Sequence, residues 1–214
     1  KVPPTLCENF SVMSKGFYQQ YKEATVYLRG LKCKTWDFLI HSEEENRKYI
    51  EAFSLRLNAA FAAIVFQALA VEAFVNLYGA QKIGEEKFYT EYEIKGATTE
   101  SKLKEICKNY LRKKYPTSTT QYNRLNSLLK KRDRIVHSKP KEIDMHSESN
   151  NYYEMFDQYE FVYKDIDDEM NSYETVKKVL QELEGSQYDL IEEIQRLLMG
   201  ELYENISEIH KIAF

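Results

Sequence analysis

Three residues near the middle of the chain, Arg132, Asp133 and His137, carry side chains that can bind an anion and move a proton. The guanidinium of an arginine is permanently charged and its planar donors match phosphate oxygens. A histidine exchanges protons near neutral pH and can therefore act as a general base or acid. Asp133 can orient Arg132 or His137, or can simply form the helix pair that a spacing of four residues allows. The natural ligand of such a segment is a polyanion.

These residues belong to the stretch from Leu125 to Pro140, LNSLLKKRDRIVHSKP, which has the pattern of an amphipathic helix that ends at the proline. Thr119 or Thr120 can cap the start of this helix. Arg132 and His137 are five residues apart, about 140° around a helix of 3.6 residues per turn, so they project from neighbouring flanks. Four nearby basic residues are expected to hold the backbone of the polyanion: Lys130, Lys131, Arg134 and Lys139.

The charge of the chain is distributed unevenly. Residues 101–141 contain 13 Lys and Arg against 2 Asp and Glu, whereas residues 142–214 contain 5 against 19. A solvated helix face usually mixes both signs. The basic segment therefore indicates either an anionic partner or internal neutralisation by the acidic C-terminal third, and both can hold together.

The remaining pattern predicts an all-α fold, an antiparallel helical bundle with a long central helix. Only 7 Gly and 4 Pro argue against a sandwich or barrel. We expect a bundle over residues 1–141 and, over 142–214, an acidic and aromatic loop followed by C-terminal helices that pack on the same bundle, giving one domain overall. Apolar spacing predicts helices at 10–34, 42–78, 99–115 or 101–115, 171–184 and 188–214, with a helical turn in 85–92.

The ends of these helices have recognisable signals. Ser42 followed by Glu45 forms a capping box at the start of the central helix, and Gly79 is its predicted C-cap. Gly30 ends the first helix, and Gly185 ends the helix at 171–184. The aromatic stretch at 151–167 has partial alternation and is either an extended segment or an irregular flap, whose aromatic rings could stack bases but pack in a core more often.

Composition narrows the classes of protein further. Three cysteines without a C-x-x-C pair argue against a disulfide framework or a zinc site, and favour a reducing, cytoplasmic location. The apolar run from Ala59 to Val71 is too short to span a bilayer, so no membrane partner is expected. Phosphate-binding glycine loops and clusters of metal-ligand motifs do not occur, and we expect no cofactor and no metal.

Glu72 interrupts the central apolar helix and is either solvated or paired with Arg132 or Arg134.

The phrase RDRIVHSKP resembles the signature of HEPN domains, in which an Arg and a following polar residue precede a His by four to six residues. The earlier phrase LAVEAFVNLYG, with Glu72 and Asn76, is similar to a second region of that family. The resemblance covers about residues 42–140. It implies a helical bundle that dimerises, Arg132 and His137 as catalytic residues, Asp133 between them, and Glu72 and Asn76 in support. Lys139 departs from the subgroup paired with nucleotidyltransferases, which has a Tyr there.

Many HEPN domains are metal-independent ribonucleases that act as toxins or antiviral defence effectors, and the resemblance implies such an activity here. The expected reaction is attack by a 2′-hydroxyl that leaves 2′,3′-cyclic phosphate and 5′-hydroxyl ends. One histidine cannot easily do both proton transfers, but a two-fold homodimer supplies two copies of His137. An antitoxin or regulatory protein is a further implied partner. The alternatives are a non-catalytic HEPN-like module that binds RNA or a protein, and a structural protein whose acidic tail covers its basic helices.

Overall fold

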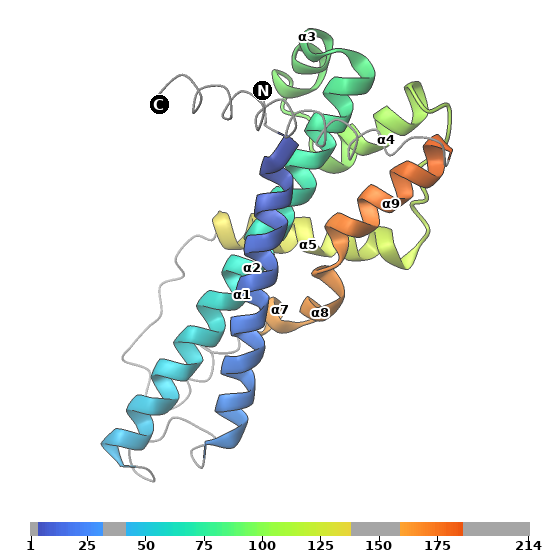
Figure 1. The fold of residues 1–214 in the computed structure, drawn as a ribbon. Coiled ribbons are helices and arrows are strands. Elements are labelled where there is room, and N and C mark those ends of the chain that lie inside the picture. Colours follow the sequence, from blue (N-terminus) through green and yellow to red (C-terminus); the bar gives the residue numbers. More distant parts are fainter. Residues whose placement is uncertain (1–3, 32–41, 138–158, 186–214) are drawn as a thin grey trace, which may run out of the picture. The chain divides into compact units, whose positions relative to one another are not determined.

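The structure, a computed structural model, describes residues 4–31, 42–137 and 159–185, and these residues contain helices and no β-strand (Figure 1). The protein is all-α, and its long central helix, α2, has 41 residues. In chain order the elements are α1 (Pro4–Gly30), α2 (Glu43–Ile83), α3 (Glu85–Phe88), the π-helix η1 (Tyr89–Glu93), α4 (Thr99–Asn109), α5 (Thr120–Val136), α7 (Glu160–Tyr163), α8 (Ile166–Glu169) and α9 (Ser172–Glu184).

The start of α2 is the one that its sequence predicts. The backbone N–H of Ser42 donates to Oε2 of Glu45 at 3.0 Å, and the backbone N–H of Glu45 donates to Oγ of Ser42 at 3.3 Å. These reciprocal bonds are a capping box. The predicted end at Gly79 is wrong, because α2 continues to Ile83 and stops before Gly84, whose φ of +93° favours glycine.

Gly79 has a packing role inside α2 instead. A Cβ atom at this position would overlap the Phe88 ring and would lie 3.0 Å from Cδ1 of Ile106. Both neighbours are buried, at 4% and 0% exposure, so neither can move without disturbing other contacts. The glycine therefore lets the Phe88 ring lie directly against the α2 backbone.

We expect Gly79→Ala to lower the free energy of unfolding by about 1–3 kcal/mol, the usual cost of overpacking a core. Gly16 in α1 is the matched control, because no described atom lies within 4 Å of a Cβ there. Gly16→Ala should raise the free energy of unfolding by about 0.5–1 kcal/mol through helix propensity alone. Urea unfolding measures both. Stabilisation by both alanines would contradict the close packing at Gly79.

Helix α2 is also apolar enough to raise the question of a membrane. It contains an 18-residue window with a mean hydropathy of 1.9, so by length and composition it could cross a bilayer. Of that window, 56% is buried inside the structure, as is usual for the core helix of a water-soluble protein. The absence of a membrane partner stays a prediction.

The described residues form two compact units, each assembled from separate parts of the chain. The α4 unit contains residues 4–9, 71–115 and 174–185, and the α5 unit contains residues 10–31, 42–70, 116–137 and 159–173. Each unit contains residues from both sides of residue 141, and the expectation that residues 1–141 and 142–214 form one domain overall stays a prediction. Each unit takes one part of α1 and one part of α2, and the boundary in α2 falls between Ala70 and Val71.

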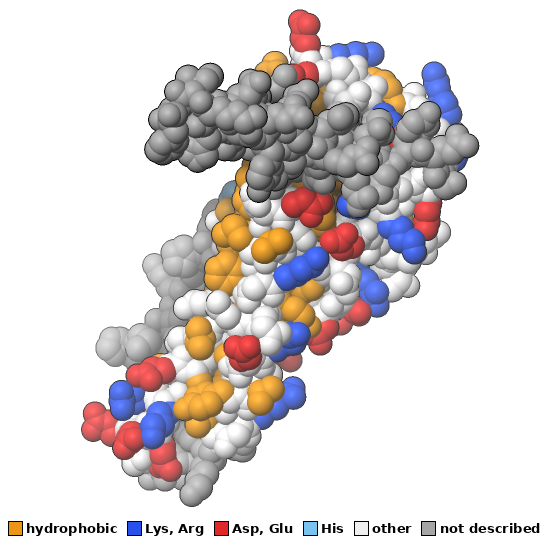
Figure 2. Space-filling model, viewed as in Figure 1, with side chains coloured by type: hydrophobic (Ala, Val, Ile, Leu, Met, Phe, Trp, Pro, Cys, Tyr) orange, Lys and Arg blue, Asp and Glu red, His pale blue; other side chains and the backbone are white. Residues whose placement is uncertain are grey.

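Within the α5 unit, α1 lies antiparallel beside the first part of α2 (Figure 1). The hydroxyl of Ser14 donates to the carbonyl oxygen of Ala63 at 2.9 Å, and the rings of Phe17 and Phe66 stack 5.6 Å apart. Apolar side chains also remain exposed on these helices (Figure 2). Val26, for example, is 67% exposed. Exposed apolar surface of this kind is typical of a contact with another molecule when it forms a continuous patch.

Within the α4 unit, the buried side chains of Lys102 and Tyr78 have close polar partners. The ammonium of Lys102, in a side chain only 4% exposed, donates to Oδ1 of Asn76 at 3.0 Å and forms an ion pair with Glu93. The hydroxyl of Tyr78 donates to Oε2 of Glu184 at 3.1 Å, and burial raises the pKa of Tyr78 to about 12. Such partners make the burial of charged and polar groups tolerable.

Other predicted boundaries hold in part. Helices α1 and α9 end at Gly30 and before Gly185 as expected, although α1 begins at Pro4 rather than at residue 10. Helix α4 ends at Asn109, short of the expected residue 115, and Arg112 then adopts a φ of +55°. The described part of the aromatic stretch forms the short helices α7 and α8 rather than an extended segment. The helix expected at 188–214 lies outside the described residues.

Candidate functional site

Helix α5 carries the candidate site, and its start follows from the sequence. The Thr119 side chain accepts a hydrogen bond from the backbone N–H of Tyr122 at 3.3 Å, so Thr119 is the N-cap. The helix ends at Val136, before the predicted stop at Pro140, and the backbone N–H of His137 closes its last turn on the carbonyl of Asp133 at 2.9 Å. His137 is the C-cap residue, with φ −109° and ψ 17°.

Of the three predicted chemical residues, Arg132 and Asp133 lie near the end of α5, and His137 directly follows its last residue. His137 is exposed, and the side chain of Arg132 is 22% exposed. Nε of Arg132 lies 3.3 Å from Oδ1 of Asp133, a side chain that is itself 61% exposed. The described contact of the Asp133 carboxylate is the one with Arg132. This contact fits the expected role of Asp133 in orienting Arg132. An ion pair this exposed adds little stability, but it restricts where the guanidinium can point.

Lys131 is a correction to the set of residues expected to contact RNA. It is only 8% exposed, and its ammonium lies 2.8 Å from Oε2 of Glu169 on α8 and also contacts the carbonyl of Lys164. Glu169 is fully buried, and burial raises the pKa of its carboxyl group despite the attraction of Lys131. The ammonium of Lys131 therefore neutralises an internal carboxylate and is not presented to a ligand.

The other basic residues of the segment have different surroundings. Lys130 and Arg134 are exposed, and the guanidinium carbon of Arg134 lies 3.7 Å from the centre of the Phe161 ring. This cation–π contact uses the face of the guanidinium, so its edge donors can still meet a phosphate. Lys139 lies outside the described residues. Two exposed cations, Lys130 and Arg134, thus accompany Arg132 on the described part of α5.

Internal neutralisation by acidic residues is real but partial within the α5 unit. Besides the pair of Lys131 and Glu169, Arg124 lies 2.8 Å from Asp168, and both side chains are about half exposed. Asp167 accepts a hydrogen bond from the hydroxyl of Tyr18 at 2.5 Å. Acidic residues of α8 therefore neutralise the charges of Arg124 and Lys131 on α5. No contact between an α8 acid and the last turn of α5 is among the described contacts.

The two supporting residues belong to the other unit. Asn76 accepts the hydrogen bond from Lys102, and Glu72 is half-buried. Both are in the α4 unit, whereas Arg132 and His137 are in the α5 unit. The supporting role of Glu72 and Asn76, and the pairing of Glu72 with Arg132 or Arg134, stay predictions.

Among the aromatic residues considered for base stacking, Tyr152, Tyr153 and Phe156 lie outside the described residues. Tyr159 packs edge-on against Phe61, with ring centres 5.7 Å apart, so the core-packing alternative holds for it. The thiol of Cys107 is fully buried, and burial raises its pKa to about 11, which argues against a nucleophilic role. No group of three or more metal-ligating side chains forms within the described ranges.

Sequence reasoning missed Glu169 as the residue that binds Lys131. A signal for the burial of Lys131 was present, because Leu125, Leu128 and Lys131 recur at intervals of three along one face, and both leucines are buried at 1% or less. No local signal could identify the partner, which lies 38 residues further along the chain.

Comparison with known proteins adds no relative: no protein-family model, no curated protein and no solved structure matches this chain.

Proposed function

We propose that this protein is a metal-independent endoribonuclease that acts as a homodimer and uses Arg132 and His137. The observation that carries the proposal is the end of α5, where an exposed imidazole and a partly exposed guanidinium occur within two helical turns. The exposed cations Lys130 and Arg134 lie on the same turns. The resemblance of RDRIVHSKP to the HEPN signature supports the same residues.

The chemistry needs one base, one acid and one cation. The imidazole of one His137 takes the proton from a ribose 2′-hydroxyl, and the 2′-oxygen then bonds to the adjacent phosphorus. The bond from phosphorus to the 5′-oxygen breaks, and that oxygen receives a proton from the imidazolium of His137 in the second protomer. Arg132 stabilises the negative charge that builds on the phosphate oxygens. The products are a 2′,3′-cyclic phosphate and a 5′-hydroxyl end.

Binding of the RNA backbone would come from Lys130, Arg134 and the guanidinium of Arg132. These contacts address phosphates rather than bases, so the grip should not depend on sequence and should weaken as salt is raised. An RNA-binding module without catalysis would use the same cations, and their exposure favours that alternative as well. Cleavage, not binding, distinguishes the two.

The test is incubation of single-stranded RNA with the protein in excess EDTA, followed by analysis of both product ends. We expect cleavage that persists in EDTA and yields 2′,3′-cyclic phosphate with 5′-hydroxyl. Arg132→Gln, purified in the same way, controls for contaminating nuclease and should cut about 10²-fold more slowly. Binding without cleavage would leave the non-catalytic alternative, and equal cleavage by both preparations would assign the activity to a contaminant.

A further inference from the structure

Three exposed residues, Lys130, Arg134 and His137, share one face at the end of α5. They follow one another at intervals of four and three residues, and such residues are surface neighbours with about 5–6 Å between their Cβ atoms. Arg132 is two residues before Arg134, so it projects from a different face, and its side chain is 22% exposed. Of the two arginines, Arg134 is therefore the one beside His137 on the exposed face.

The guanidinium of Arg134 packs against one aromatic ring. Its central carbon lies 3.7 Å from the centre of the Phe161 ring, which belongs to α7. That separation is the ordinary contact distance of carbon groups, so the ring covers one face of the guanidinium. Arg134 is nevertheless exposed, and its side chain has no ion pair and no hydrogen bond with the described residues. The opposite face and the edge of the guanidinium are therefore open to solvent.

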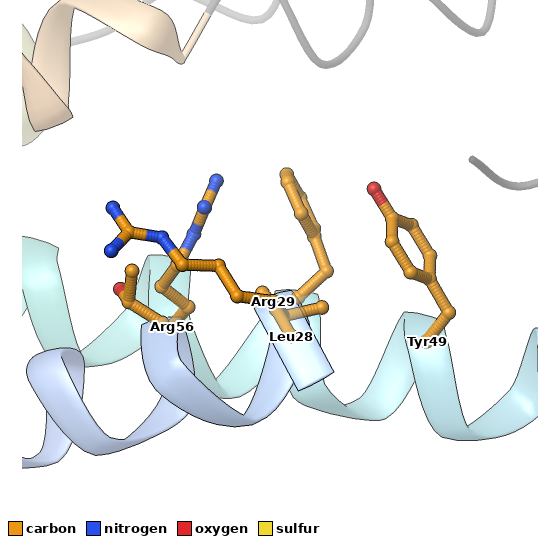
Figure 3. A pocket seen from close by; sticks show the side chains of 6 residues that line it. Leu28, Arg29, Tyr49 and Arg56 are labelled. Atoms are coloured by element: carbon orange, nitrogen blue, oxygen red, sulfur yellow. The ribbon is translucent and has the colours of Figure 1, made fainter. Parts of the chain in front are cut away.

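Arg56 in the same unit makes a similar ring contact and provides a comparison. It lines a pocket between α1 and α2 (Figure 3), and its guanidinium carbon lies 4.1 Å from the centre of the Tyr163 ring. Burial raises the pKa of Tyr163, and the charge of Arg56 and a hydrogen bond from Arg56 oppose that rise. Phe161 has no hydroxyl, so its contact with Arg134 uses none of the N–H donors of the guanidinium. Arg56 thus serves the fold, whereas Arg134 keeps donors and one face for a ligand.

A flat cation supported by a ring is a suitable stacking surface for a nucleobase. Unpaired bases in protein–RNA complexes stack on aromatic rings and on the planes of arginine guanidinium groups. Phosphates instead bind the edge of a guanidinium, where its N–H donors point. Lys130 has no planar group, so of the two exposed cations on this face Arg134 is the one that can stack a base. The contact with Phe161 orients the guanidinium in advance, which lowers the entropy lost on binding.

We propose that Arg134, held by Phe161, stacks the base of a nucleotide bound beside His137, and that a purine is preferred there over a pyrimidine. This role rests on the proposed ribonuclease function and adds to it a residue that determines specificity. Because Arg134 and His137 are neighbours on one face, a base stacked on Arg134 has its own ribose and phosphate close to the imidazole. A purine presents two fused rings to the guanidinium and a pyrimidine presents one, so the purine stacks more strongly.

Equilibrium binding of the whole chain to short 2′-O-methyl RNA tests this role without cleavage, because the oligomer lacks the attacking hydroxyl. Oligoadenosine should bind about tenfold more tightly than an oligomer of equal length that carries no bases. Arg134→Lys keeps the positive charge but loses the planar group, so it should remove most of that difference. Its affinity for the oligomer without bases should change less than about twofold, because the phosphate contacts depend on charge.

Oligouridine tests the preference for purines. It should bind wild type more weakly than oligoadenosine, and Arg134→Lys should bring the two affinities together. Phe161→Leu should act in the same direction, because the guanidinium is then no longer held against a ring. Arg47→Lys makes the same chemical change at an exposed arginine whose described partner is Glu51 at 3.5 Å rather than a ring. It should alter the preference for adenosine less than about twofold.

Three results would overturn the stacking role: equal binding of oligoadenosine and the oligomer without bases, equal weakening of both by Arg134→Lys, or an equal effect of Arg47→Lys. None of them bears on cleavage, since 2′-O-methyl RNA reports binding alone. Conversely, a preference for adenosine that Arg134→Lys removes, in a protein that cuts no RNA, would reject the ribonuclease function and keep the contact of Arg134 with the base.

Discussion

Alanine in place of His137 should lower the rate of RNA cleavage by about 10²–10⁴-fold, the range that one positioned acid or base contributes. His137 is exposed beyond the last turn of α5, so its removal should not disturb the fold. RNA binding should change little, because the proposed phosphate contacts come from Arg132 and the exposed cations rather than from His137. The measurement is single-turnover cleavage of a labelled RNA in EDTA, together with the salt dependence of binding.

Mixed dimers make the same substitution more informative. If two copies of His137 serve one reaction, a dimer of one wild-type and one His137→Ala subunit is inactive. Excess His137→Ala protein, allowed to exchange subunits, should therefore suppress the activity of a fixed amount of wild type. Val136→Ala is the matched control, since Val136 is the neighbouring residue and is 54% exposed. Unchanged activity with excess His137→Ala would exclude a shared site.

Replacing Lys131 by methionine should lower the free energy of unfolding by about 3–5 kcal/mol at neutral pH. The side chain keeps its approximate length, but the fully buried Glu169 loses the cation at 2.8 Å. A buried carboxylate without its partner is the costly state, whereas an apolar pair of similar volume is not. The double variant Lys131→Met, Glu169→Leu should therefore recover most of the loss in urea unfolding.

Arg124 provides the matched control for that experiment. It joins α5 to α8 through Asp168 at 2.8 Å, but its side chain is 41% exposed and that of Asp168 is 51% exposed. An exposed pair contributes about 0–1 kcal/mol, so Arg124→Ala should have a small effect. If Arg124→Ala and Lys131→Met lowered the free energy of unfolding equally, the burial of the Lys131–Glu169 pair would not be the cause of the loss.

The dependence on pH follows from Glu169. Burial raises the pKa of its carboxyl group in the folded chain, so between the unfolded-state and folded-state pKa values the folded state holds a proton that the unfolded state releases. This contribution to stability is fully present below the ordinary carboxyl pKa of 4.5 and is lost as the pH rises through the higher folded-state value. Without Lys131 the shift should grow, so Lys131→Met should be less destabilising near pH 4 than near pH 7.

Local signals in the sequence predicted the ends of helices better than they predicted the site. The capping bonds of Ser42 and Thr119 depend on residues within three positions, so the pattern alone suffices. Gly79 was misjudged because an isolated glycine in a helical pattern suits either an end or a close packing contact, and the Phe88 ring decides between them.

The candidate site shows the opposite limit. Arg132 and His137 could be placed on α5 from spacing, because a helix fixes the geometry of neighbours. The fate of Lys131 could not, because it depends on a carboxylate brought to it by tertiary packing. A count of positive charges treats a buried lysine and an exposed one alike, although only the exposed one can meet a phosphate.

The path of α2 through both units has a consequence for how the molecule comes apart. The helix has no break at Ala70 and Val71, and α1 and α9 likewise pass from one unit to the other within a helix. Because each of these three crossings lies inside a helix, cleaving the backbone there breaks a helix and does not release an intact unit. Unfolding of either unit must therefore unwind part of a helix that also belongs to the other unit. We expect the α4 unit and the α5 unit to unfold cooperatively.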